Sequence, residues 1–174
     1  MKPVISTYMA KSLYQIDLEF FNPKVFKTII FDLDNTLIPP KEKKPSKQSY
    51  ELIEAILKKG INVFICSNRG KKRVKYFASY YKVNYLANTA KPFSYRLKRF
   101  ISQNGIEKES CLYVGDKIIN DMFMAKKVGL KSLYVEPLMR KQGIYSLLSP
   151  IEKKLQKKYA RENRLGSYVA RKEH

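Results

Sequence analysis

The chain has 174 residues, the size of one domain with a substantial hydrophobic core. Its 35 Lys+Arg residues outnumber 15 Asp+Glu residues, and the resulting net charge of +20 favours anionic partners: nucleic acid, acidic membrane surfaces or phosphorylated substrates. A basic solubilising surface is the alternative interpretation. The only histidine is the last residue, His174, which excludes triads and metal sites built on histidine.

The chain shows no signal for insertion into a membrane or for export. No apolar run approaches the roughly 18 residues that span a bilayer. The first residues lack a hydrophobic stretch followed by a cleavage site, so we do not expect secretion. Cys66 and Cys111 lie in apolar, strand-like stretches, and two cysteines make no disulfide framework. We therefore expect buried thiols in a cytoplasmic protein.

The predicted elements alternate along most of the chain. The first 24 residues are irregular, and we expect one helix there, on the flank of the sheet. The segments predicted as strands are Phe26–Phe31, Asn62–Cys66, Val83–Ala87, Cys111–Val114 and Ser132–Val135. The segments predicted as helices are Ser46–Lys59, Lys71–Tyr81, Phe93–Gln103 and Asn120–Val128. This alternation predicts a three-layer α/β/α sandwich with a mainly parallel sheet.

We divide the chain into a flanking segment (1–24), a core (25–148) and a basic C-terminal helix and tail (149–174). The last part begins with Ser149-Pro150-Ile151-Glu152, which has the form of a capping box with proline at the first helical position. Ile151, Leu155 and Tyr159 then form an apolar stripe among lysines. Such a helix either docks on the domain or lies on an anionic membrane, and both interpretations stay open.

Two carboxylates follow the first strand of the predicted core. Asp32 and Asp34 are two residues apart, so on extended backbone they point to the same side. Two acids that face one cleft repel each other unless a cation, a shared proton or a phosphate ligand accommodates them. This indicates a chemical site. The alternative is a helix-capping loop, where Asp, Asn and Thr are common.

Polar residues suited to phosphate chemistry also follow the next three strands. They are Ser67-Asn68-Arg69, then Lys91-Pro92, then Gly115-Asp116 with Asp121 further on. Ligands of open α/β sheets bind beyond the carboxyl ends of the strands. Four strand ends that point to one kind of chemistry are stronger evidence than any one of them.

These residues resemble the four motifs of the haloacid dehalogenase superfamily over roughly residues 25–136. The motifs match Asp32-x-Asp34-x-Thr36, Ser67, Lys91 and Gly115-Asp116-x4-Asp121. The resemblance implies a Rossmann-like fold and a Mg²⁺-dependent phosphohydrolase that forms an aspartyl-phosphate intermediate. An aspartate at the second position is typical of the phosphatases and phosphomutases of the superfamily, so we expect hydrolysis of a phosphomonoester.

The resemblance also implies a role for each matching residue. Asp32 is expected to be the nucleophile, and Asp34 the acid that protonates the leaving oxygen and then the base that activates water. Mg²⁺ would be held by Asp32, the backbone carbonyl of Asp34 and Asp116, with Asp121 as a direct or outer ligand. Phosphate would be bound by Thr36, Ser67, Asn68 and Lys91.

The spacing of the motifs leaves no room for an inserted cap domain. Only a short insert follows Thr36, and the stretch between Ser67 and Lys91 is long enough for one helix and one strand. An open site suits a substrate whose bulk stays outside, such as a protein, a nucleic-acid end or a lipid head group. Five basic residues form a candidate substrate rim: Lys41, Lys43, Lys44, Arg69 and Lys117.

Within the superfamily, the short chain and its Asp-Leu-Asp-Asn-Thr-Leu segment resemble subfamily IIIA and its YqeG-type branch, which includes phosphatidylglycerophosphate phosphatases. This implies removal of the terminal phosphate from phosphatidylglycerophosphate at the inner membrane surface. Lys117 and Asn120 stand where glutamine and threonine are common in that branch. Three alternatives stay open: a soluble phosphatase for small esters, a nucleic-acid 3′-phosphatase and a binding protein without activity. The sequence leaves the oligomeric state open.

Overall fold

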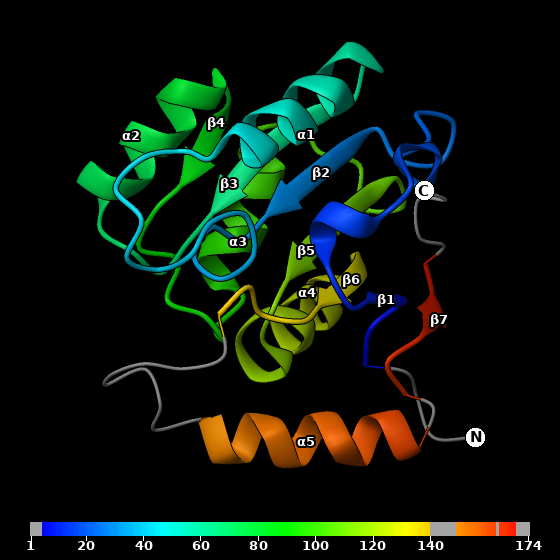
Figure 1. Ribbon diagram of the computed structural model, residues 1–174. Helices are drawn as coiled ribbons and strands as arrows, with labels where there is room; N and C mark the ends of the chain where they lie inside the picture. Colours follow the sequence, from blue (N-terminus) through cyan, green and yellow to red (C-terminus); the bar gives the residue numbers. More distant parts are fainter. Residues whose placement is uncertain (1–4, 140–148, 163, 170–174) are drawn as a thin grey trace.

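A seven-stranded sheet with the order β4-β3-β2-β5-β6-β1-β7 forms the centre of the computed structural model (Figure 1). The structure describes residues 5–139, 149–162 and 164–169. The strands are β1 (Tyr8–Ala10), β2 (Thr28–Phe31), β3 (Asn62–Cys66), β4 (Asn84–Leu86), β5 (Cys111–Gly115), β6 (Lys131–Val135) and β7 (Ser167–Tyr168). Every described pair of neighbouring strands is parallel. The expected parallel α/β sheet is confirmed.

Helices cover both faces of this sheet. They are α1 (Lys47–Lys58), α2 (Lys71–Tyr81), α3 (Tyr95–Gln103), α4 (Phe123–Val128) and α5 (Ser149–Arg161), with two short 3-10 turns (Leu13–Gln15, Leu18–Phe20) and a π-helical turn, η3 (Ile118–Met122). α1 and α2 pack on one hydrophobic cluster, and α3, α4 and α5 on the other. Within β2, Ile29 belongs to the first cluster and Ile30 to the second, because successive side chains point to opposite faces.

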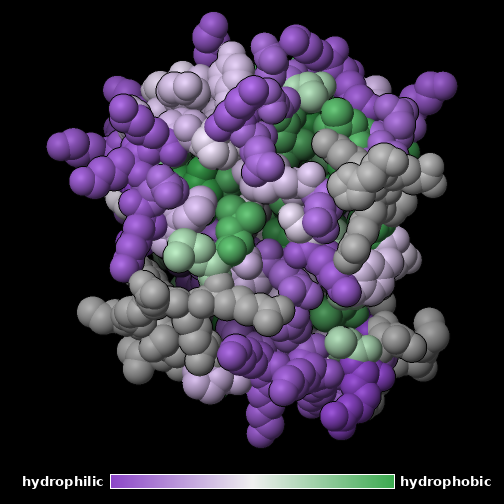
Figure 2. Space-filling model, in the orientation of Figure 1, coloured by the Kyte–Doolittle hydropathy of each residue, from purple (hydrophilic) through white to green (hydrophobic). Residues whose placement is uncertain are grey.

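The central strands are buried from end to end, which explains their continuous apolar sequences. All residues of β2 and β5 are buried, as expected for strands with helices on both sides. Cys66 and Cys111 lie in this core as free thiols, as predicted. On the face shown in Figure 2, hydrophilic side chains dominate, with smaller hydrophobic areas between them. Within the described ranges, every helix is too short or too polar to cross a bilayer.

The expectation of one helix in the first 24 residues is wrong. This segment contributes β1, which lies between β6 and β7, and Tyr8 of β1 pairs with Leu133 of β6. β1 and β7 are only three and two residues long, too short for a local pattern to reveal them. They are strands because β1 forms backbone hydrogen bonds with β6, and β7 with β1. Both flanking segments therefore join the sheet of the core.

α5 docks most of its apolar stripe on the domain. Tyr159 is buried and its ring contacts Phe123 edge to face, Leu155 packs on the same cluster, and Ile151 is 50% exposed. The lysines of α5 face outward. This confirms the docking interpretation for two of the three stripe residues. The core boundary drawn at 148, the side chain of Ser149, the end of the tail and His174 lie outside the described part.

Glu152 of α5 contacts the turn that follows β5. Its carboxylate accepts hydrogen bonds from the backbone N–H groups of Ile118 and Ile119, both at 3.0 Å. Burial raises the pKa of Glu152, and these two donors lower it in part. Glu152 therefore caps the neighbouring η3 turn, which connects β5 to α4.

We predict that Glu152→Ala lowers the free energy of unfolding by about 1–3 kcal/mol, because two partly buried N–H groups lose a charged acceptor. Glu152→Gln should have a smaller effect, since its amide retains one acceptor oxygen. Urea denaturation measures both. Glu51→Ala, at an exposed position on α1, is the control and should change stability by less than about 0.5 kcal/mol. Equal stability of all four proteins would contradict the capping role.

Candidate active site

The four motif-bearing segments meet because their strands are neighbours in the sheet. The order β4-β3-β2-β5 places the carboxyl ends of these strands side by side. All four strands are parallel, so the residues that follow them emerge at the same edge. Residues 37–46 form a loop without a helix, and α2 and β4 fill the stretch between Ser67 and Lys91. The site therefore has no inserted cap, as predicted.

Three buried carboxylates lie at the centre of this edge. Asp32, Asp116 and Asp121 each place one oxygen so that the three oxygens lie within 4.8 Å of one another. Burial, with the neighbouring acid Asp121, raises the pKa of Asp32. Burial likewise raises the pKa of Asp116 to about 8. These three side chains gather negative charge where water cannot solvate it, so the cluster needs a positive partner.

Lys91 supplies part of that positive charge. Its ammonium donates to Asp32 Oδ1 and, at 2.8 Å, to Asp121 Oδ1. Burial alone would lower the pKa of Lys91, but the carboxylates of Asp121 and Asp32 outweigh it and raise the pKa above its ordinary value. Lys117 Nζ lies 3.5 Å from Asp116 Oδ1. Two ammonium groups against three carboxylates leave an excess of negative oxygen ligands, a donor set that fits a hard divalent cation.

Thr36 connects two of the carboxylates. Its hydroxyl oxygen lies 3.2 Å from Asp32 Oδ2 and 3.4 Å from Asp116 Oδ1, so its single proton can be donated to one of them at a time. Thr36 is fully buried. The sequence suggested a phosphate contact for this residue, whereas in the structure its described contacts are to these carboxylates.

Asp121 is held by a set of short contacts around the η3 turn. Its Oδ1 accepts from Tyr113 OH at 3.2 Å, and its Oδ2 from the backbone N–H of Lys117 at 3.1 Å. A Cβ atom at position 115 would lie 2.6 Å from the Cβ and Cγ of Asp121. Only glycine permits this approach, which explains the Gly115-Asp116 pair in the motif.

Ser67 and Asn68 organise the loop after β3. Ser67 is buried, and its hydroxyl accepts from the backbone N–H of Arg69 at 3.2 Å. The side chain of Asn68 contacts the main chain of Lys91 twice: Oδ1 accepts from N–H at 2.8 Å, and Nδ2 donates to the carbonyl at 3.3 Å. Asn68 thereby connects the second motif to the third and positions the backbone that carries the Lys91 ammonium.

Asp34 lies apart from the carboxylate cluster. Its side chain accepts from Arg69 Nε at 3.0 Å and from Arg73 of α2 at 2.8 Å. Arg73 also donates to the carbonyls of Glu42 and Pro40, at 2.8 and 3.2 Å. Arg73 was not identified as a site residue from the sequence. The one feature that could have indicated it is its position in the first turn of α2, which directly follows the Ser67-Asn68-Arg69 segment.

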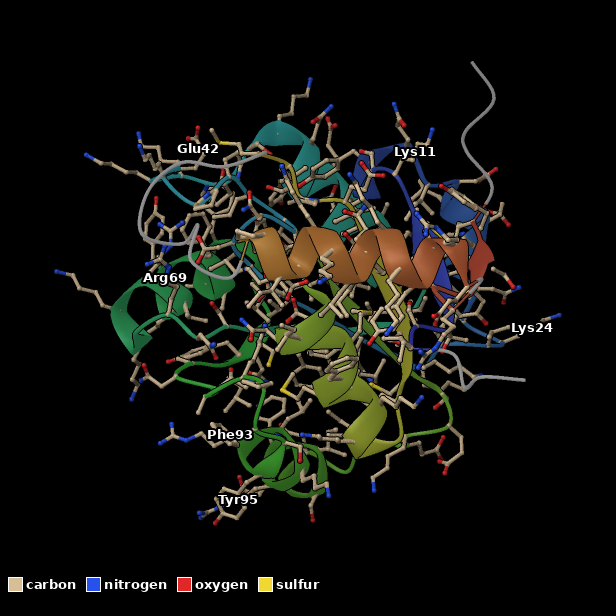
Figure 3. The ribbon with its side chains drawn as sticks, turned by 90° about the horizontal axis from the view of Figure 1, so that it is seen from below. Lys11, Lys24, Glu42, Arg69, Phe93 and Tyr95 are labelled. Carbon is tan, nitrogen blue, oxygen red and sulfur yellow. The ribbon has the colours of Figure 1, made fainter. Side chains whose placement is uncertain are left out.

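The expected basic rim divides into two groups. Lys41, Lys43 and Lys44 are exposed on the loop between β2 and α1. Arg69 and Lys117 instead pair with Asp34 and Asp116 inside the site. Figure 3 shows Arg69 and Glu42 on the same side of the molecule, which is where the loop after β2 meets α2. The three lysines are therefore exposed on a loop that contacts α2, whereas Arg69 and Lys117 form ion pairs within the site.

Comparison with known proteins places this chain in a family. Residues 40–135 match the model of the haloacid dehalogenase-like hydrolases. The chain is 28% identical over 133 residues to the "Probable phosphatase YqeG" of Bacillus subtilis (strain 168), a match that covers 76% of this chain and 77% of that protein.

Two solved structures share the fold. One is the cobalt-bound form of the deoxy-D-mannose-octulosonate 8-phosphate phosphatase (YrbI) from Haemophilus influenzae, with a TM-score of 0.56 and 12% identity, covering 85% of this chain and 80% of that one. The other is an uncharacterized protein from Listeria monocytogenes serotype 4b, with a TM-score of 0.54 and 14% identity, covering 76% and 99%. The family model spans more than half of the sequence, and the chain therefore belongs to the haloacid dehalogenase-like hydrolases, as an enzyme of the phosphatase type.

Proposed function

We propose that the protein hydrolyses a phosphomonoester in a Mg²⁺-dependent reaction that forms an aspartyl phosphate on Asp32, and that its substrate is phosphatidylglycerophosphate. The observation that carries the chemistry is the buried cluster of Asp32, Asp116 and Asp121 around the Lys91 ammonium. A structural ion pair would need one acid for one base. Three acids, one after β2 and two after the neighbouring strand β5, support a site for a cation and a phosphate.

In the proposed reaction, Asp32 attacks phosphorus with one carboxylate oxygen. A P–O bond forms to Asp32 while the bond to the leaving alcohol oxygen breaks, and Asp34 gives that oxygen a proton. Asp34 then takes a proton from water, whose oxygen attacks the aspartyl phosphate, so inorganic phosphate leaves and the Asp32 carboxylate is restored. Arg69 and Arg73 hold Asp34 away from the nucleophile, which separates the two roles.

The remaining residues would position the phosphoryl group and balance its charge. Lys91 and the Ser67 hydroxyl are our candidates for contacts with phosphate oxygens, with Thr36 and Asn68 beside them. Asp32, Asp116 and the backbone carbonyl of Asp34 would hold Mg²⁺. Asp121 would hold it directly or through water, since both of its oxygens already accept hydrogen bonds. When bound, the cation offsets negative charge on the transferring group.

The lipid substrate is supported by the surroundings of the site. There is no cap to enclose a small molecule, so the bulk of the substrate can stay outside. Lys41, Lys43 and Lys44 are exposed on the loop whose Pro40 and Glu42 contact Arg73, a partner of Asp34. Each basic residue near an anionic leaflet contributes roughly 1 kcal/mol. The net charge of +20 also favours binding to an anionic membrane surface. A peripheral enzyme at an anionic membrane surface fits these features.

Asp32→Asn tests the nucleophile. The amide keeps the size of the side chain but cannot attack phosphorus, so we expect turnover of a soluble aryl phosphate to fall by at least about a thousandfold. Glu51→Gln on α1 is the control and should keep full activity. Radiolabelled substrate should leave an acid-stable, hydroxylamine-sensitive label on the wild-type chain only. Mg²⁺-dependent turnover by Asp32→Asn would contradict the mechanism.

The carboxylate cluster predicts that Mg²⁺ stabilises the protein more at high pH. Because the pKa of Asp116 is raised to about 8, protonation of Asp116 stabilises the metal-free protein at low pH, and this contribution is lost as the pH rises through about 8. Protons compete with the cation over the same range. The rise in Tm caused by Mg²⁺, relative to an EDTA-treated sample, should grow from about pH 6 to about pH 8.5. At a Mg²⁺ concentration of 100 Kd, the corresponding gain in the free energy of unfolding is about 2.7 kcal/mol.

Asp116→Asn is the matched control for this measurement and should abolish most of the growth of the Mg²⁺ effect with pH. Glu51→Gln should preserve it. A Mg²⁺ effect that is absent, or that is the same at every pH, would argue against a cation at these carboxylates.

A panel of substrates tests the lipid assignment. We expect Mg²⁺-dependent release of phosphate from phosphatidylglycerophosphate in anionic vesicles, with a kcat/KM at least about tenfold higher than for small sugar phosphates or 3′-phosphorylated DNA. Preference for a sugar phosphate would indicate a soluble small-molecule phosphatase. Preference for the oligonucleotide, with strong dependence on salt, would indicate a nucleic-acid phosphatase.

A further inference from the structure

Two aromatic side chains that follow Lys91 closely in the chain project into solvent. Phe93 and Tyr95 are 71% and 70% exposed, the highest fractions among the large hydrophobic side chains of the described residues. They follow Lys91 by two and four positions. Figure 3 shows both at the start of α3, directed outward. Exposing a phenylalanine to water is unfavourable, because its burial would contribute about 1.5–3 kcal/mol.

The backbone that carries these two exposed rings is held by hydrogen bonds. The backbone N–H of Phe93 donates to the carbonyl of Ala90 at 2.9 Å, and that of Lys98 to the carbonyl of Ser94 at 2.9 Å. Arg96 donates to the carbonyl of Asn88 at 2.7 Å. Asn68 holds the main chain of Lys91 just upstream. A hydrogen-bonded turn therefore presents the two rings, and neither ring makes an aromatic contact within the described part of the chain.

The same helix carries exposed positive charge. Leu97 and Ile101 of α3 are buried against the sheet, which leaves a face of α3 in solvent with Arg96, Lys98 and Arg99 on it. α3 has no acidic residue in its first turn, although acids are favoured there by the helix dipole. We name Phe93, Tyr95, Arg96, Lys98 and Arg99 together the α3 tip.

We propose that the α3 tip is the surface through which the protein docks on an anionic bilayer, with Phe93 and Tyr95 entering the interfacial region and the three basic side chains contacting lipid phosphates. Aromatic rings beside Lys and Arg are the composition of interfacial anchors. Two residues of extended chain span at most about 7 Å, so a membrane at Phe93 lies close to the Lys91 end of the site. This inference rests on the proposed lipid substrate and identifies how the site would reach it.

Sedimentation with vesicles tests the proposal. The full-length protein should bind vesicles that contain phosphatidylglycerol, and much less to pure phosphatidylcholine, since the basic residues respond to surface charge. The double variant Phe93→Ser/Tyr95→Ser should bind the anionic vesicles about tenfold more weakly. Tyr168→Ser is the matched control: Tyr168 is 62% exposed but lies on β7, at the opposite edge of the sheet from β4. It should bind like the wild type.

A second pair of variants tests the charge. Lys98→Gln/Arg99→Gln should reduce the preference for anionic over neutral vesicles. Lys11→Gln/Lys24→Gln removes the same charge from a part of the surface away from the α3 tip (Figure 3) and should change the preference much less. All variants should hydrolyse a soluble aryl phosphate at the wild-type rate, which shows that the fold and the chemistry are intact.

The outcomes separate this proposal from the proposed function. Wild-type vesicle binding by the Phe93→Ser/Tyr95→Ser variant would overturn the α3 tip as an anchor, whatever the substrate is. Loss of vesicle binding in that variant, with no hydrolysis of phosphatidylglycerophosphate by the wild type, would retain the anchor and reject the lipid substrate. If the variant instead loses affinity for single-stranded oligonucleotide and keeps its vesicle binding, the rings serve as a stacking surface for bases and the proposal is wrong.

Discussion

The structure of the site depends on the burial of three carboxylates beside one lysine. Asp32, Asp116 and Asp121 cannot all be ionised in a dry environment without positive charge, and the Lys91 ammonium contacts two of them directly. The edge of the sheet is the place where four chain segments can bring such groups together. The contacts around the site keep these three carboxylates close together although their charges repel each other.

Each neighbouring contact serves that purpose through backbone geometry. Gly115 lets the Asp121 side chain approach β5, and Asn68 holds the main chain at Lys91. Glu152 of α5 caps the η3 turn that carries Asp121. The C-terminal helix is therefore coupled mechanically to the site, although it contributes no residue to the carboxylate cluster. Asp34, in contrast, is held out of the cluster by two arginines, so the two aspartates of one motif have different surroundings.

Much of this could be predicted before the structure, and the failures have physical causes. The alternation of apolar runs and helical periods identified the sheet and its covering helices. The expected helix in residues 1–24 was wrong because β1 is defined by its pairing with β6 and not by its own three residues. The role of Arg73 was not predicted, because an arginine in the first turn of a surface helix is usually a solvated charge. Its role depends on the approach of α2 to Asp34.

By itself, the sequence determined the type of fold, the motif residues at the ends of four strands, and the absence of a cap. These are properties of local periodicity and spacing. Only the tertiary structure decided the strand order that makes those ends neighbours, the division of the basic rim into exposed lysines and paired residues, and the outward direction of Phe93 and Tyr95. The reason is that a local pattern records whether a side chain prefers water or core, whereas the partner it meets depends on segments far away in the chain.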